Sequence, residues 1–187
     1  MLRFMVAYHS EEGQTEKVAH HVARQIENRG QVARLIQTDD LDDISMVGGF
    51  DAAIIAGALH MGAYGPALAE FVSKHADDLN KVPSAFLSVS LSAASGDPLD
   101  LVGTEREALE FQEETGWSPE HTQYVAGAVR DRQSGFLKQL IIHTIMRLKG
   151  VELDPSGTTE FTDWKALDRF VTGFVAEVAA TRADARL

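Results

Sequence analysis

The sequence predicts an α/β fold in which a doubly wound, five-stranded parallel sheet is covered by helices on both faces. Five short runs rich in apolar side chains alternate with segments of helical periodicity, the order typical of α/β proteins. The runs are almost continuously apolar, which indicates parallel strands buried on both faces. Because 187 residues are close to the length of one domain of roughly 150 residues, we expect residues 1–187 to form a single domain.

The strands and helices are expected in strict alternation along most of the chain. The predicted strands are Leu2–Tyr8, Val32–Ile36, Ala52–Ala58, Ala85–Leu91 and Tyr124–Val129. A helix with an apolar stripe follows the first strand and stops at Gly30, a residue suited to a left-handed cap. A second helix begins at Pro66, a third covers about 105–115, and a last one runs from 164 to 180 after the cap candidates Thr162 and Asp163.

Composition excludes several classes of function. Acidic residues outnumber basic ones 28 to 17, so the surface repels phosphate backbones, and nucleic acid is not an expected partner. The chain has no cysteine, which excludes disulfides and thiolate chemistry. His20 and His21 point to different faces of a helix, so we expect no metal site there. With neither a secretion signal nor an apolar run of about 20 residues, a cytoplasmic protein is expected, with any membrane contact peripheral, on the inner face of the cell membrane.

The segment after the first strand has the composition of a phosphate-binding loop. It reads Ser10, Glu11, Glu12, Gly13, Gln14 and Thr15, and then enters a helix. A helix N-terminus presents free backbone N–H groups, hydroxyls add donors, and glycine allows close approach. Neither the P-loop nor the dinucleotide fingerprint is present, so a mononucleotide phosphate fits better. The alternative that the two hydroxyl residues only cap the helix stays open.

Together with several later motifs, this loop resembles a known family. The Ser10-x-x-Gly-x-Thr15 pattern is similar to the phosphate loop of flavodoxins. The whole chain resembles the flavodoxin-type, menaquinone-dependent protoporphyrinogen IX dehydrogenases of bacteria. The motifs that carry this resemblance are Gly13-Gln14-Thr15, Gly62-Ala63-Tyr64, Glu70-Phe71-Val72-x-Lys74-His75-Ala76, Pro83-Ser84-Ala85-Phe86-x-Ser88-Val89, Ala126-Gly127-Ala128-x-Arg130 and Thr162-Asp163-Trp164.

The resemblance implies a flavodoxin-like fold that binds FMN without a covalent bond. The phosphate is expected on residues 10–15. Two further loops are expected beside the flavin ring, made of His60, Met61, Gly62, Ala63 and Tyr64, and of Ser88, Val89, Ser90, Leu91 and Ser92. The first of these loops is glycine-rich with one aromatic, a combination that allows close approach to a flat ring and a stacking partner beside it. The alternative that Tyr64 is an ordinary aromatic at the edge of the surface stays open. No catalytic side chain is expected, because the redox chemistry belongs to the cofactor.

A segment of about 130–160, after or within the fifth strand, exceeds what a minimal flavodoxin-like domain needs. Its first part is basic, with Arg130, Arg132 and Lys138 among its charges, and these three residues and His60 are candidate contacts of an anionic substrate. A helix over 136–149 is apolar on more than one side. It is interpreted either as a core helix or as a helix that lies against a membrane surface or a bulky apolar ligand.

The family resemblance implies an FMN-dependent oxidoreductase of haem biosynthesis that oxidises a porphyrinogen and passes electrons to menaquinone. Two alternatives stay open. One is an electron carrier that docks a partner through its acidic surface, and the other is an FMN-dependent quinone reductase fed by NAD(P)H. A second copy of the chain, in a homo-oligomer, is a further candidate partner.

Overall fold

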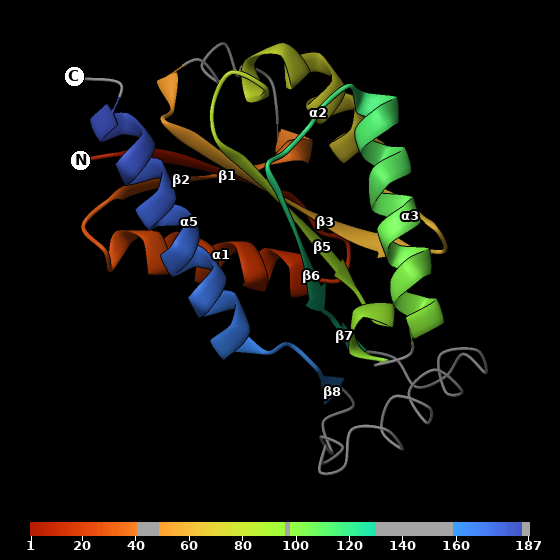
Figure 1. The fold of residues 1–187 in the computed structure, drawn as a ribbon. Helices are drawn as coiled ribbons and strands as arrows, with labels where there is room; N and C mark the ends of the chain where they lie inside the picture. Colours follow the sequence, from red (N-terminus) through yellow and green to blue (C-terminus); the bar gives the residue numbers. More distant parts are fainter. Residues whose placement is uncertain (41–48, 96–97, 130–158, 185–187) are drawn as a thin grey trace.

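Five parallel strands form the central sheet, in the spatial order β2-β1-β3-β5-β6. They are β1 (Arg3–His9), β2 (Val32–Gln37), β3 (Ala52–His60), β5 (Ser84–Ser90) and β6 (His121–Ala126). A two-residue strand, β4 (Ala63–Tyr64), pairs antiparallel with the end of β3. The computed structural model describes residues 1–40, 49–95, 98–129 and 159–184. The predicted doubly wound α/β fold is confirmed (Figure 1).

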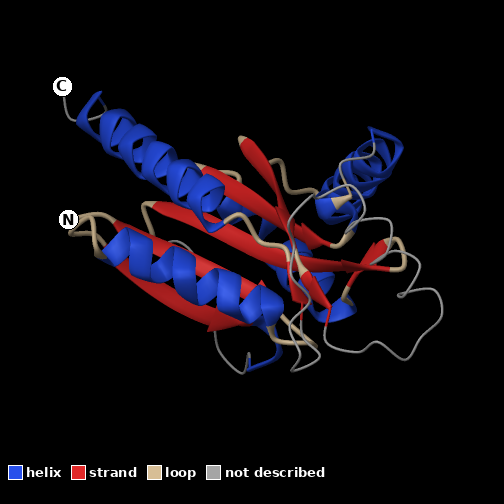
Figure 2. Ribbon diagram, turned by 90° about the horizontal axis from the view of Figure 1, so that it is seen from below, coloured by secondary structure: helices blue, strands red, loops and turns tan. Residues whose placement is uncertain are grey.

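Two pairs of helices cover the two faces of this sheet. Helices α1 (Gln14–Glu27) and α5 (Trp164–Asp184) pack on one face, and α2 (Pro66–Leu79) and α3 (Pro98–Thr115) pack on the other. Side chains of β1 alternate between the two cores, because successive residues of a strand point to opposite faces. Figure 2 shows the strands as a twisted layer with the helices against it.

The strand order reverses between β1 and β3. From β1 the chain crosses through α1 to β2 on one side, and β3 then returns to the other side of β1. In a doubly wound sheet, the crevice outside the carboxyl ends of the strands at this point is where ligands bind. The loops after β1 and β3 therefore border the expected site.

The structure corrects the predicted end of the fifth strand. The strand expected over Tyr124–Val129 ends at Ala126, and the Gly127 N–H makes the last hydrogen bond of its pairing with β5, to the Ser90 carbonyl oxygen at 2.9 Å. The next two residues form β7 (Ala128–Val129), which pairs antiparallel with β8 (Thr159–Glu160) in a separate small sheet. The residues between these two strands, 130–158, lie outside the described part of the chain.

Smaller differences follow from edge position and helix capping. The second strand was expected to be buried, but β2 is only partly buried because it forms one edge of the sheet. Helix α3 begins at Pro98, about two turns before the predicted start, since proline is accepted in a first turn. The cap predicted at Asp163 is confirmed, because its Oδ1 accepts the Ala166 N–H at 2.9 Å. Finally, β1 extends one residue further than predicted and includes His9.

Candidate functional site

The loop between β1 and α1 leaves the start of the helix open. Helix α1 begins at Gln14, its N-cap is Gly13, and no side chain makes a capping hydrogen bond. The Gly13 backbone is left-handed, with φ of 84°, a conformation that favours glycine. The first N–H groups of a helix have no partner within the helix, so those of residues 14–16 form a cluster of donors at its positive end.

Ser10 shapes this loop from inside. Its Oγ accepts the Gly13 N–H at 3.0 Å, which folds the chain back on itself just before the helix. Thr15 is buried in the first turn. Because neither hydroxyl caps the helix, the alternative that they serve only as caps does not agree with the structure. Amide donors, hydroxyls and a glycine thus lie together, and they fit a phosphate group.

The loop after β3 is a tight hairpin whose tip faces solvent. Met61 and Gly62 both have positive φ, 49° and 84°, and the flanking pair His60 and Ala63 are register partners of β3 and β4. Two central residues with positive φ are typical of a type I′ turn. The side chains of His60 and Met61 are exposed, so both are accessible to a ligand.

Tyr64 lies inside the protein rather than on its surface. Its ring centroid is 5.0 Å from that of Phe86 and 4.8 Å from that of Phe111, and its hydroxyl donates to the buried Ser88 Oγ at 2.8 Å. Burial raises the pKa of the Tyr64 hydroxyl, which keeps it neutral and able to donate. The ring is committed to core contacts, so the stacking role predicted from the sequence does not fit this position.

Gly57, inside β3 and three residues before its end, is required by that packing. A Cβ on Gly57 would lie 2.5 Å from Leu68 Cδ2 and 3.0 Å from Tyr64 Cδ1. Ordinary side chains therefore do not fit at Gly57 without movement of the core. The hydroxyl bond of Tyr64 joins the hairpin to β5, so the two loops expected beside a flavin ring are held together.

The second predicted ring loop begins inside a strand. Ser88, Val89 and Ser90 are buried residues of β5, and only Leu91 and Ser92 follow it. The Ser90 Oγ accepts the Ala93 N–H at 3.1 Å, where the chain turns into the short helix η3 (Ser92–Ala94). The part of this segment that a ligand reaches is therefore its last two residues, which are half-buried.

His9 is a residue of this site that the sequence interpretation missed. It ends β1 directly before the phosphate loop, and only 9% of its surface is exposed. Its Nδ1 lies 3.1 Å from Asp39 Oδ2 in the short helix η1 (Thr38–Asp40). Its Nε2 is buried without a hydrogen-bond partner, and Glu11 Oε1 lies 3.7 Å away. The signal in the sequence was its place between the predicted strand and the phosphate loop.

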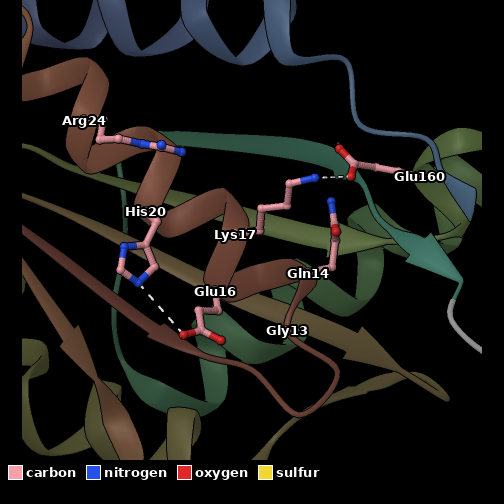
Figure 3. Close-up of a pocket in the computed structure, with 7 residues that line it drawn as sticks. All are labelled: Gly13, Gln14, Glu16, Lys17, His20, Arg24 and Glu160. Carbon is pink, nitrogen blue, oxygen red and sulfur yellow. Dashed lines mark hydrogen bonds and ion pairs between the residues drawn. The ribbon is translucent and has the colours of Figure 1, made fainter. Parts of the chain in front are cut away.

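An open groove of about 490 Å³ runs along helix α1 beside the phosphate loop (Figure 3). Lys17 reaches across it and forms an ion pair with Glu160 of β8, while Gln14 donates to the Thr162 Oγ1 at 2.8 Å. Thr162 in turn donates to the Ala126 carbonyl oxygen at 2.6 Å. The start of α1 is thus tied to the strands that border residues 130–158. The groove is lined by Gly13, Gln14, Glu16, Lys17, His20, Arg24 and Glu160.

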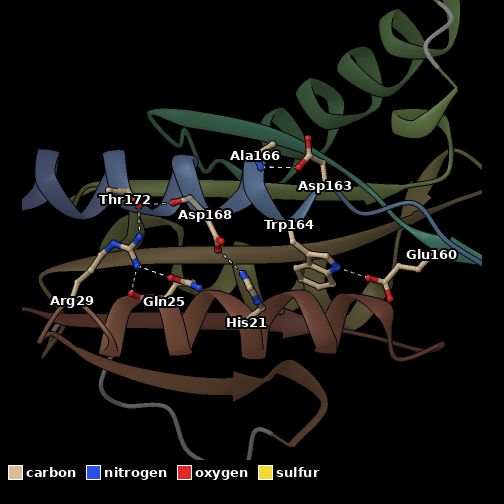
Figure 4. A network of polar contacts seen from close by, with 9 residues as sticks. All are labelled: His21, Gln25, Arg29, Glu160, Asp163, Trp164, Ala166, Asp168 and Thr172. Carbon is tan, nitrogen blue, oxygen red and sulfur yellow. Dashed lines mark hydrogen bonds and ion pairs between the residues drawn. The ribbon is translucent and has the colours of Figure 1, made fainter. Parts of the chain in front are cut away.

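Helices α1 and α5 are joined by a second set of polar contacts (Figure 4). His21 Nε2 lies 2.6 Å from Asp168 Oδ1, and the His21 ring packs on Trp164 with 4.6 Å between centroids. The Trp164 Nε1 donates to Glu160 Oε1 at 2.6 Å, and Lys17 Nζ lies 5.3 Å from the centre of its ring. Through these contacts, the Thr162-Asp163-Trp164 motif holds the start of α5 against α1 and β8.

Arg130, Arg132, Lys138 and the expected helix over 136–149 lie outside the described residues. Within the described ranges, no group of three or more His, Asp or Glu side chains could hold a metal ion. No helix in those same ranges is long and apolar enough to cross a membrane.

Comparisons with known proteins agree with this geometry. A family model described as a flavodoxin domain matches residues 5–156. A curated relative from Escherichia coli strain K12, named protoporphyrinogen IX dehydrogenase [quinone], is 28% identical over 178 residues, which cover 95% of both chains. A relative of the same name from Leishmania major is 28% identical over 173 residues, covering 92% of this chain and 74% of the relative.

Several solved structures with the same fold are flavodoxins. A short-chain flavodoxin associated with a bacterial microcompartment has a TM-score of 0.59 at 14% identity, covering 95% of this chain and 99% of that one. A flavodoxin from Fusobacterium nucleatum bound to flavin mononucleotide has a TM-score of 0.51 at 9% identity, covering 97% and 99%. At these identities the likeness concerns the fold, and it confirms the flavodoxin-like architecture expected from the sequence.

Proposed function

Because this chain belongs to the flavodoxin family, we propose that it is an FMN-dependent oxidoreductase that folds as a single domain, with an insertion at about 130–160. The observation that carries the proposal is the uncapped start of α1 at the crossover point of the sheet, with the left-handed Gly13 before it. That arrangement offers amide donors to a phosphate. The expected cofactor, FMN, agrees with the family and with the flavin mononucleotide bound to the Fusobacterium nucleatum flavodoxin.

The residues of this chain divide the binding of FMN between three loops. Residues 10–15 hold the phosphate through backbone N–H groups and the hydroxyls of Ser10 and Thr15. The hairpin 60–64 and the segment 88–92, through its accessible residues Leu91 and Ser92, border the ring, with the bond from Tyr64 to Ser88 fixing their separation. Bound FMN supplies the redox chemistry, taking reducing equivalents from one substrate and giving them to another.

The proposed reaction is the oxidation of a porphyrinogen with a quinone as electron acceptor. Both curated relatives carry the name protoporphyrinogen IX dehydrogenase [quinone], and the relation to the Escherichia coli protein extends over 95% of each chain. Hydrogen removed from the porphyrinogen reduces the quinone. The family resemblance implies that this quinone is menaquinone. His60, exposed on the hairpin tip, is the described candidate for contact with an anionic substrate, and Arg130, Arg132 and Lys138 are the others.

The cofactor proposal is tested by titrating flavin-free protein with FMN and following flavin fluorescence. Wild-type protein should quench it, and Gly13→Ala should weaken binding about tenfold or more, because a Cβ disfavours the left-handed backbone of the loop. Gly30→Ala is a matched control, since Gly30 also has positive φ, 72°, and lies beyond the other end of α1. Absence of quenching by the wild type, or equal loss in both variants, would contradict the proposal.

The reaction is tested anaerobically with protoporphyrinogen IX and a menaquinone analogue, followed by porphyrin fluorescence. An increase above the enzyme-free rate is expected, and no increase would contradict the proposed substrate. Peripheral membrane contact through 136–149 is tested separately, by sedimentation of the protein with vesicles containing anionic lipid. Protein that stays in the supernatant would remove that contact from the proposal.

A flavodoxin-like electron carrier is the second candidate, favoured by the flavodoxins among the solved structures. Deletion of residues 130–150 distinguishes the two, because the enzyme should lose porphyrinogen oxidation while a carrier should keep electron transfer. An NAD(P)H-fed quinone reductase would instead show rapid bleaching of bound flavin when a nicotinamide is added.

A further inference from the structure

The phosphate loop contains an electrostatic conflict that the proposed function must resolve. Two of its six residues, Glu11 and Glu12, are acidic, and both side chains are exposed. Asp39 adds a third carboxylate, since it contacts the residue just before the loop. The phosphate of FMN is itself an anion, so carboxylates in and beside the loop oppose its binding. A positive charge close to these carboxylates would offset their repulsion of the phosphate.

His9 is placed to supply that charge. A carboxylate only accepts hydrogen bonds, so the contact of Nδ1 with Asp39 Oδ2 at 3.1 Å requires a proton on Nδ1. The other nitrogen, Nε2, is buried without a hydrogen-bond partner, and Glu11 Oε1 lies 3.7 Å from it. A lone pair on Nε2 would be buried and would face a carboxylate, whereas an N–H there faces an opposite charge. The charged ring satisfies both of its neighbours.

The ring is also fixed in position by the chain around it. His9 lies on β1 opposite Gly57 of β3. A Cβ on Gly65 would lie 2.6 Å from its Cδ2 and Nε2, so the backbone of the hairpin loop closes directly against the ring. Through Glu11, Asp39 and Gly65, this one imidazole contacts all three segments that follow β1, β2 and β3–β4. It therefore holds its charge at the crossover point of the sheet.

We propose that His9 is a positioning residue of the phosphate site, which as an imidazolium draws Glu11 and Asp39 together and cancels their charge where the flavin phosphate binds. This inference rests on the proposed binding of FMN. It concerns the phosphate alone. The affinity for riboflavin, which has the same ring and no phosphate, should therefore not depend on His9.

The test compares the affinities of FMN and riboflavin, measured by fluorescence titration at low ionic strength, in the wild type, three variants of this site and one control variant. His9→Asn keeps a donor near Asp39 and removes the charge, and it should weaken FMN about tenfold or more while riboflavin changes less than about twofold. Glu11→Gln removes the opposing charge from an exposed position, and it should strengthen FMN. The double variant His9→Asn with Glu11→Gln should recover most of the FMN affinity, which a purely structural role of the ring would not produce.

His121→Asn is the matched control, because His121 also contacts a glutamate, Glu177, at 2.8 Å, but at the amino end of β6. Its affinities for both flavins should equal those of the wild type. Equal losses for FMN and riboflavin in His9→Asn, no recovery in the double variant, or an unchanged or weaker FMN affinity in Glu11→Gln would overturn the inference. Failure of the wild type to bind FMN would overturn the proposed function together with it, so the two failures are distinct.

Discussion

The buried hydrogen bond from Tyr64 to Ser88 makes a sharp prediction about stability. Tyr64→Phe removes one oxygen atom and keeps the ring in contact with Phe86 and Phe111. Ser88 is fully buried and Tyr64 is only 8% exposed, so water cannot replace the lost hydroxyl. Loss of one partner in such a pair costs about 1–2 kcal/mol of folding free energy. For a domain of this size, that is a decrease in Tm of about 2–8 °C.

The assay is urea unfolding followed by circular dichroism, with Ser88→Ala and the double variant completing a cycle. Ser88→Ala leaves the Tyr64 hydroxyl buried without its acceptor, which should cost about 1–3 kcal/mol. The double variant should cost clearly less than the sum of the single variants, with a coupling energy of about 1 kcal/mol. Strictly additive losses, or a Tyr64→Phe protein as stable as the wild type, would refute the reasoning that this bond joins the two loops.

Three further predictions concern packing, surface charge and acid stability. Gly57→Ala should lower the free energy of unfolding, measured in urea, by about 1–3 kcal/mol, because the added Cβ would lie 2.5 Å from Leu68. A decrease under about 0.5 kcal/mol would show that the core adjusts to the added atom. Lys17→Met should lower the free energy of unfolding by at most about 1 kcal/mol, since the ion pair of Lys17 with Glu160 is exposed. A decrease above about 2 kcal/mol would contradict this expectation. Burial lowers the pKa of His75, so its charged form is disfavoured in the folded state. The stability of the wild type relative to His75→Gln should therefore fall as the pH drops below about 6.5 and be constant above about pH 7.5. Thermal unfolding of both proteins at several pH values measures this difference. A relative stability that rises in acid would contradict the prediction.

The alternation of strands and helices could be predicted because it depends on local pattern. Apolar runs such as 52–58 are long enough to indicate buried strands, and the observed β3 differs from that prediction only at its end. The end of β6 was misplaced because Ala128 and Val129 pair with β8 instead of continuing along β5. Such a contact between residues distant in sequence leaves no periodic signal.

The phosphate loop was recognisable because its residues are adjacent in sequence, and the structure shows the open helix start there. Tyr64 was misread because an aromatic in a glycine-rich turn has the same sequence pattern whether it faces a ligand or the core. His9 was overlooked because its partners, Glu11, Asp39 and Gly65, come together only when three strands align. Which charged side chains meet across these loops is decided by the order of the strands in the sheet, and no local motif shows it.

The small ladder between β7 and β8 brings Val129 and Thr159 together as register partners, although 29 positions separate them along the chain. A stretch that leaves and re-enters a scaffold at one point can be exchanged or shortened with little effect on the scaffold itself. The ladder can therefore act as a grafting point. Chimeras that carry a relative's residues between these two positions should still bind flavin. Their preference for a reducing substrate should match that of the relative that supplied the segment.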